Sequence, residues 1–303
     1  MSTVRDVRDL GLLALLWGTI FPAAEIGLST FPPLLLMALR FDVASLLMIG
    51  YVVLRSEDWR PRSRGDVLAI VAGGVLWTVI GNGVWYIGQA LTTSVFSGIM
   101  TSLVPVLTAG FSWVLLPKER LRPLSIAGLG IGFVGVLVML VPSGAITFTE
   151  SLLGKAILFG GAGGVALASV LIRYADMSLS SSVQTAWSAA LGAVLLHALS
   201  PLFGETWSGE VPLIAGVAVA YLGIISTVVA YLLYFSLLQR RPSFEVTLVM
   251  YLSPVVAATT GWLLFGEPIT FSMVGGFLLV VAGFSLMKRE EIQAELTRYG
   301  IVD

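Results

Sequence analysis

One face of the apolar stretch 67–90 carries side chains that could bind a small molecule. The polar and aromatic residues on this face are Thr78, Asn82, Trp85 and Gln89. Steps of four, three and four residues place all of them on the same side of a helix. Hydroxyl, amide and indole groups can hydrogen-bond to a solute or stack on it, but none of them is an acid, base or nucleophile at neutral pH. This face therefore predicts binding rather than catalysis.

A matching face lies 149 residues further along the chain, with Thr227, Tyr231 and Tyr234 at the corresponding positions. A single hydroxyl inside an apolar helix is about as often a packing feature, because it can bond to its own backbone. The two faces match both in position and in spacing, so we interpret them as two walls of one cavity.

Two prolines, Pro105 and Pro254, share the same 149-residue separation. A proline inside a helix frees a backbone carbonyl and bends the helix, so we predict a hinge at each position. The other residues that we expect to line the cavity are Thr101, Met250, Tyr251 and, in the first apolar stretch, Trp17.

The sequence offers no set of residues for catalysis or for holding a cofactor. The chain has 0 Cys and 1 His, so it lacks a thiolate metal site, a Cys nucleophile and a cluster of histidines. No Gly-Lys-Ser/Thr phosphate loop is present, and Glu119 and Glu267 each lie at a turn before a helix, where a carboxylate is expected without catalysis. A net charge of −1 argues against binding to nucleic acid. We expect no enzyme, no cofactor, no metal and no nucleic-acid partner.

The composition indicates a membrane protein. Only 12% of the residues are charged and 57% are hydrophobic, which leaves too few charges for the surface of a soluble protein of 303 residues. The apolar runs are continuous over about 20 residues, as in membrane-spanning helices, and do not alternate as barrel strands do. We predict an all-α membrane protein with ten transmembrane helices, at residues 10–28, 33–54, 67–90, 94–116, 121–142, 152–173, 181–203, 211–237, 243–266 and 270–288.

The basic residues predict how these helices are oriented. If the amino terminus lies in the cytoplasm, all but two of the 17 Lys and Arg residues fall on the cytoplasmic side or at its boundary. The exceptions are Arg40, within the second span, and Lys155, near the outer end of the sixth. Because cytoplasmic loops of membrane proteins are enriched in Lys and Arg, we predict that both termini are cytoplasmic and that the protein lies in a bacterial inner membrane.

The matched positions also predict an internal repeat. Residues 1–142 would form a first five-helix repeat, 143–150 a connecting loop, 151–289 a second repeat and 290–303 a cytoplasmic tail. An odd number of spans in each repeat requires the two repeats to be inserted with opposite polarity. Inverted repeats are typical of secondary transporters, in which the substrate site lies near the midplane between the two halves.

Several short motifs resemble a known family. They are Ala90-Leu91-Thr92-Thr93-Ser94, Pro105, Glu119 and Gly128 in the first repeat and Pro254, Gly266-Glu267, Gly276 and Gly283 in the second. Their order resembles that of the drug/metabolite transporter superfamily, in its ten-span EamA-type branch, and within it the bacterial exporters of amino acids, including aromatic ones. The resemblance covers essentially the whole chain and implies export of small metabolites by alternating access through a central cavity.

The expected lining favours a particular kind of solute. Trp, Tyr, Met, amide and hydroxyl groups without a fixed charge suit a neutral or zwitterionic solute with an apolar body, such as an amino acid. We expect Arg40 to point outward and to form an ion pair with Glu25 or Asp42 rather than to bind substrate. The alternative is a proton-linked extruder of cationic aromatic drugs with the same fold.

Coupling to protons has little support in the sequence. The groups in the spans that could carry a proton are Glu25, Asp42, His197 and Glu245, and all lie towards span ends. We therefore favour facilitated, gradient-driven export. The partners that we expect are the small-molecule substrate and the lipid bilayer, and a monomer is one option for the assembly state.

Overall fold

The computed structural model describes residues 2–55, 58–91, 100–116, 122–140, 151–252 and 271–287, together with Val256, Thr259 and Arg289. The predicted hinge Pro254 and the turn residues Glu119 and Glu267 lie outside the described residues, as do the predicted loop 143–150 and tail 290–303.

Helices account for nearly all of the described residues, and no strand occurs among them. The first repeat contains α1 (Ser2–Gly18), α2 (Ile20–Leu28), α3 (Pro33–Leu54), α4 (Arg64–Val71), the π-helix η1 (Ala72–Val84), α5 (Trp85–Ala90), α7 (Val104–Leu115) and α8 (Pro123–Leu140). The second contains α9 (Leu152–Tyr174), α10 (Ser181–Leu202), α11 (Leu213–Gly223), the π-helix η2 (Ile224–Val229), α12 (Ala230–Arg240), α13 (Ser243–Thr247) and α15 (Phe271–Met287).

Each of the ten predicted spans contains helix, and the predicted fold class is confirmed. Five helical segments are long and apolar enough to cross a bilayer on their own: Pro33–Leu54, Arg64–Gln89, Leu152–Tyr174, Ser181–Leu202 and Leu213–Arg240. The π-helical turns continue the helix instead of ending it, so the third and eighth spans are each one continuous helix. The third span consists of α4, η1 and α5, and the eighth consists of α11, η2 and α12.

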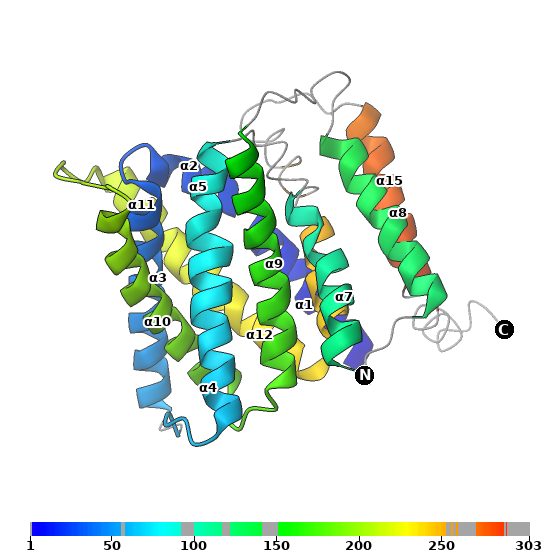
Figure 1. Ribbon diagram of the computed structural model, residues 1–303, viewed down its shortest axis with the longest axis horizontal. Helices are drawn as coiled ribbons and strands as arrows, with labels where there is room; N and C mark the ends of the chain where they lie inside the picture. Colours follow the sequence, from blue (N-terminus) through cyan, green and yellow to red (C-terminus); the bar gives the residue numbers. More distant parts are fainter. Residues whose placement is uncertain are drawn as a thin grey trace.

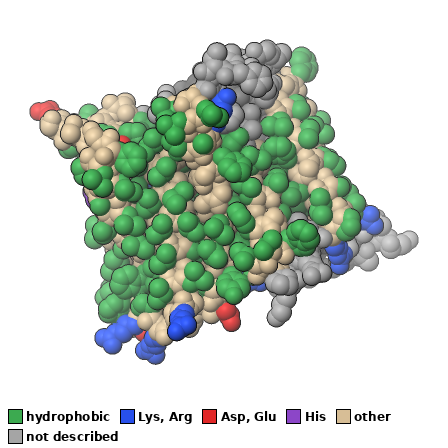
Figure 2. Space-filling view, in the orientation of Figure 1, with side chains coloured by type: hydrophobic (Ala, Val, Ile, Leu, Met, Phe, Trp, Pro, Cys, Tyr) green, Lys and Arg blue, Asp and Glu red, His purple; other side chains and the backbone are tan. Residues whose placement is uncertain are grey.

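The two repeats run in opposite directions. In Figure 1, α1 begins at the lower edge, where α15 ends, whereas α9 begins at the upper edge. The helices that occupy equivalent places in the two repeats also pair with each other, since α3 packs on α10 and α8 packs on α15. Figure 2 shows a broad apolar surface with Lys and Arg gathered mainly along the lower edge, as expected of a protein that is surrounded by lipid.

Two carboxylates, one buried and one half-buried, tie loops of the second repeat to helices of the first. Asp66, fully buried at the start of α4, accepts hydrogen bonds from the backbone N–H of Ser178 and Leu179, in the loop before α10, at 2.8 and 3.2 Å. Glu205, in the loop after α10, accepts hydrogen bonds from the N–H of Leu34 and Leu35, the unpaired donors at the start of α3, at 2.9 and 3.0 Å. These hydrogen bonds therefore hold α3, α4 and α10 together near both ends of the helices.

Glycines allow α8 and α15 to approach until their backbones touch. A Cβ atom on Gly128 would lie 2.6 Å from the carbonyl oxygen of Gly283, and a Cβ atom on Gly283 would lie 2.6 Å from the backbone nitrogen of Gly132. Small residues at such crossings are the usual means of packing helices in lipid, where no hydrophobic effect drives helices together.

This contact predicts different effects for two glycines of the same helix. Gly128→Ala must push α15 away, at a cost of about 1–3 kcal/mol, and should lower the melting temperature of the purified protein by a few degrees. Gly130→Ala is the matched control, because nothing lies within 4 Å of a Cβ atom there. Thermal unfolding of both variants in detergent tests the contact, and a Gly128→Ala variant as stable as Gly130→Ala would contradict it.

Candidate functional site

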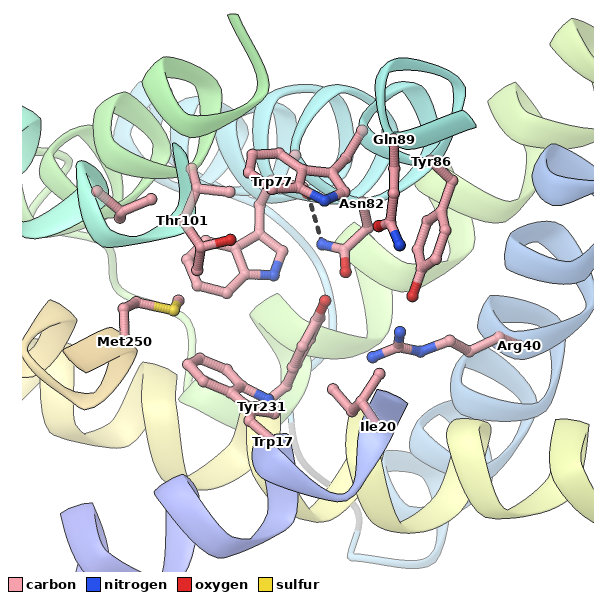
Figure 3. Close-up of a pocket in the computed structure, with 14 residues that line it drawn as sticks. Trp17, Ile20, Arg40, Trp77, Asn82, Tyr86, Gln89, Thr101, Tyr231 and Met250 are labelled. Carbon is pink, nitrogen blue, oxygen red and sulfur yellow. Dashed lines mark hydrogen bonds between the residues drawn. The ribbon is translucent and has the colours of Figure 1, made fainter. Parts of the chain in front are cut away.

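A cavity lies between helices of both repeats. The centre of a water-sized molecule can occupy about 140 Å³ of it, and the empty space is about 820 Å³ when the part that opens to solvent is included. Its lining consists of Trp17, Ile20, Arg40, Trp77, Gly81, Asn82, Trp85, Tyr86, Gln89, Thr101, Val104, Val165, Tyr231 and Met250 (Figure 3).

Two π-helical segments shape this cavity from matched positions in the two repeats. In η1 the Asn82 amide donates a hydrogen bond to the carbonyl of Trp77, five residues earlier, at 2.9 Å. In η2 the Thr227 hydroxyl donates to the carbonyl of Leu222, again five residues earlier, at 2.8 Å. A widened helical turn leaves carbonyls without their usual partner, and such turns are frequent at functional sites. Here polar side chains of the same helix satisfy the carbonyls.

Arg40 of α3 is the one cation among the lining residues, and it is only 1% exposed. Its Nε donates a hydrogen bond to the Thr227 hydroxyl at 2.6 Å, and its Nη2 donates to the carbonyl of Ser226 at 3.3 Å. Both acceptors belong to η2 in the other repeat. Figure 3 shows the guanidinium pointing into the cavity from one side.

The expected ion pair between Arg40 and Asp42 is therefore wrong. Asp42 instead lies 2.7 Å from His197 Nε2 of α10, and both of these side chains are partly exposed. Residues two apart in a helix point to different sides, so Asp42 points away from the interior that Arg40 enters. The side chain of the other expected partner, Glu25, is outside the described residues.

A layer of aromatic rings closes the cavity towards the end of the molecule where α1 begins. Its members are Trp17, Trp77, Tyr231, Tyr234 and Phe235. The rings of Trp77 and Tyr234 have centroids 4.5 Å apart, and those of Trp17 and Tyr234 are 5.2 Å apart. Tyr234 is fully buried, and its hydroxyl hydrogen-bonds to that of Ser169 in α9 at 2.7 Å. The layer thus joins helices of both repeats directly beneath the cavity.

Six of the residues expected to line the cavity do so: Trp17, Asn82, Trp85, Thr101, Tyr231 and Met250. Gln89, from the same predicted face, lines it as well. They come from α1, η1, α5, α12 and the segments around α7 and α13, so the structure brings the two predicted walls together around one space.

The other expected residues lie around the cavity without lining it. Thr78 packs against Gly192 of α10, and Thr227 accepts the hydrogen bond from Arg40. Tyr234 belongs to the aromatic layer, and the Tyr251 hydroxyl donates to the carbonyl of Leu129 in α8 at 3.2 Å. Pro105 lies at the start of α7, directly after a turn at Leu103, and its role as a hinge stays a prediction.

Sequence reasoning missed Trp77, Tyr86 and the inward orientation of Arg40. The predicted face assumed the period of an α-helix, whereas the turns of η1 are wider, so the lining residues there follow steps of five and four from Trp77 to Asn82 and Tyr86. No local signal in the sequence announces π-helical turns. The absence of an acidic residue one turn from Arg40 on its own face was a usable signal for its orientation.

Comparison with known proteins places the chain among transporters. The model of the EamA-like transporter family matches residues 10–141 and again 152–289. An uncharacterized transporter of Archaeoglobus fulgidus is 25% identical over 93% of this chain and 98% of its own length. The uncharacterized inner membrane transporter YedA of Escherichia coli K12 is 26% identical over 91% of this chain and 87% of its own. One crystal structure shares the fold, with a TM-score of 0.82, 23% identity and coverage of 96% of this chain and 99% of that one.

Two tyrosines, three residues apart on α12, should respond differently to loss of the hydroxyl. Tyr234→Phe removes the buried hydrogen bond to Ser169 and should cost about 1 kcal/mol of stability. Tyr231→Phe is the control, because the Tyr231 hydroxyl forms no hydrogen bond of good geometry, and it should cost less stability than Tyr234→Phe. The two melting temperatures in detergent are the measurement, and equal losses in both variants would rule out this arrangement of the layer.

Proposed function

The chain belongs to the EamA-like transporter family, and from this premise we propose that it is a secondary transporter that exports small neutral or zwitterionic metabolites, in particular amino acids and aromatic ones among them. The observation that carries the proposal is the cavity, because it is lined by both repeats and ends on an aromatic layer that both repeats also build. One central site between two inverted halves is what alternating access requires.

The lining supports a solute with an apolar body and a few polar groups. Indole and phenol rings from Trp17, Trp85 and Tyr86 offer flat surfaces for an aromatic or branched side chain. The amides of Asn82 and Gln89 offer both donors and acceptors. A few polar groups in a mostly apolar site fix the orientation of a small ligand, while the apolar area provides most of the affinity.

We further propose that the structure is an outward-facing state. With both termini in the cytoplasm of a bacterium, as the basic residues along the lower edge in Figure 2 indicate, the aromatic layer lies between the cavity and the cytoplasm. The lower ends of the helices are held by further contacts between repeats, such as the hydroxyls of Ser112 and Ser243 at 2.7 Å and the ion pair of Asp9 with Arg240 at 3.6 Å. These are the contacts of an outward-facing state, and they must separate to admit solute from the cytoplasm.

Export of cationic aromatic drugs in exchange for protons is less well supported. Such transport needs a carboxylate that binds either the proton or the drug, and the described lining contains none. The guanidinium of Arg40 would repel a cation in the same space. The pair of Asp42 and His197 is separate from the cavity lining, so export driven by the solute gradient remains our proposal.

Transport by the purified protein in proteoliposomes tests the proposal. We expect uptake of radiolabelled phenylalanine, tryptophan or leucine down their gradients, with the same rate when a pH gradient is imposed. Liposomes without protein are the control. Uptake of cationic dyes together with no uptake of any amino acid would overturn the proposed substrates, and uptake that requires a pH gradient would overturn the proposed driving force.

The absence of native cysteines allows a test of the outward-facing state. Gln89→Cys places a thiol in the cavity lining and should react with a membrane-impermeant thiosulfonate added from outside, more slowly when phenylalanine is present. Ser169→Cys is the control, because Ser169 is fully buried beneath the aromatic layer and should not react. Equal labelling of both cysteines, or labelling of Gln89→Cys only from the cytoplasmic side, would contradict the assigned state.

A further inference from the structure

Three hydrogen-bond donors meet at one end of the cavity without enough acceptors. The two bonds from Arg40 to oxygen atoms use two of the five N–H groups of its guanidinium, and its Nη1 lies 4.0 Å from the sulfur of Met37, a weak acceptor. The Tyr231 hydroxyl and the Trp77 indole N–H are buried, and neither forms a hydrogen bond of good geometry, although Trp77 and Asn82 lie close enough to the Tyr231 hydroxyl to interact with it. Buried donors are normally paired, so this group is built to receive an acceptor that is not part of the chain.

Packing of the helices does not explain why the residue at this place is an arginine. Thr227, which receives the bond from Arg40, has Thr78 as its counterpart in the first repeat. Thr78 makes the equivalent contact with the other half through Gly192 of α10, where no charged side chain takes part. The same helix contact therefore forms without a cation in one repeat, and a buried charge is costly in lipid unless something pairs with it.

The two ends of the cavity differ in chemistry. Figure 3 shows the guanidinium of Arg40 and the hydroxyls of Tyr86 and Tyr231 turned towards one region, with the amides of Asn82 and Gln89 beside it. Met250 and Thr101 lie at the opposite end. A solute in this space is thus oriented, with an anionic head towards α3 and an apolar body towards α13.

We propose that the cavity recognises a carboxylate through Arg40, assisted by the Tyr231 hydroxyl, and that its substrates are small monocarboxylates with an aromatic or other apolar body. This inference rests on the proposed transport function and narrows its substrate class. The planar guanidinium matches a carboxylate with two parallel hydrogen bonds, which makes it the preferred partner for that group. An amino acid qualifies through its carboxylate, but its ammonium group is not required.

The charge balance of the described lining sets the order of preference. One guanidinium and no carboxylate line the cavity, so a monoanion neutralises the site whereas a cation adds to its charge. The ammonium group of an amino acid can find only neutral acceptors there, such as the amide oxygens of Asn82 and Gln89. An aromatic carboxylate without an ammonium group should therefore bind at least as well as the amino acid of the same shape.

A series of three ligands with the same phenyl ring tests this directly. The compounds are 3-phenylpropionate, which has only the carboxylate, phenylalanine, which has both charges, and phenylalaninamide, which has only the ammonium. Binding to the full-length protein in detergent can be followed by tryptophan fluorescence, because Trp17, Trp77 and Trp85 line the cavity. We expect 3-phenylpropionate and phenylalanine to bind at least about tenfold more tightly than phenylalaninamide, the ratio that one charge-assisted hydrogen bond supplies.

Variants of Arg40 locate the effect. Arg40→Gln should weaken the binding of 3-phenylpropionate about tenfold or more, and it should leave the binding of phenylalaninamide unchanged or slightly tighter. Arg40→Lys keeps the positive charge but loses the planar guanidinium that can form two parallel hydrogen bonds. Its affinity for 3-phenylpropionate should therefore lie between those of Arg40→Gln and the unaltered protein. Arg60→Gln is the matched control, since Arg60 lies over Trp59 in an exposed loop, and it should not alter binding of any of the three compounds.

The ligand series on the unaltered protein decides the question even if Arg40→Gln does not fold. Binding of phenylalaninamide as tight as that of 3-phenylpropionate, or an Arg40→Gln variant that keeps the full preference, would overturn the role of Arg40. Proteoliposome uptake separates this failure from failure of the proposed function. Uptake of phenylalanine and phenylalaninamide at equal rates would contradict carboxylate recognition but would be consistent with the proposed transport function. No uptake of any amino acid or carboxylate would contradict both proposals.

Discussion

A chain in lipid must satisfy its polar groups within itself, and this constraint governs the structure. The backbone does so by forming helices, and several buried hydroxyls do so by donating to the carbonyl one turn earlier, as Thr108, Ser169 and Thr185 do at 2.6–2.8 Å. Against this background the unpaired donors of Tyr231 and Trp77 and the partly paired guanidinium of Arg40 stand out, because they border the same cavity. We propose that a solute completes hydrogen bonds at this site.

The inverted repeat explains how such a site arises and why its two walls differ. The π-helices η1 and η2 lie at matched positions and widen the helix in the same way, so each repeat contributes one irregular wall. The substituents on these walls are not equivalent, since η1 provides Trp77 and Asn82, whereas η2 faces Arg40 and is followed by Tyr231. On the proposed function, the symmetric framework would serve alternating access and the asymmetric side chains would orient the ligand.

Much of the fold could be predicted from the sequence because the bilayer limits the choices. Continuous apolar runs define the spans, and the matched positions such as Thr78 with Thr227 define the repeat. Asn82 and Tyr231 could be identified because both lie on polar faces at the same depth, and both line the cavity. Trp77 and Tyr86 could not, since π-helical turns change the period. The direction of Arg40 depends on Ser226 and Thr227, about 186 residues away, and the sequence around Arg40 indicates only that no acidic partner lies one turn away on its own face.

The most direct test of the account is a cryo-electron microscopy structure of the full chain with bound 3-phenylpropionate. The account predicts ligand density inside the cavity, with the carboxylate within hydrogen-bonding distance of the Arg40 guanidinium and the Tyr231 hydroxyl and the phenyl ring towards Met250. Density at another site, or a carboxylate that points away from Arg40 while the ring occupies the polar end, would contradict it.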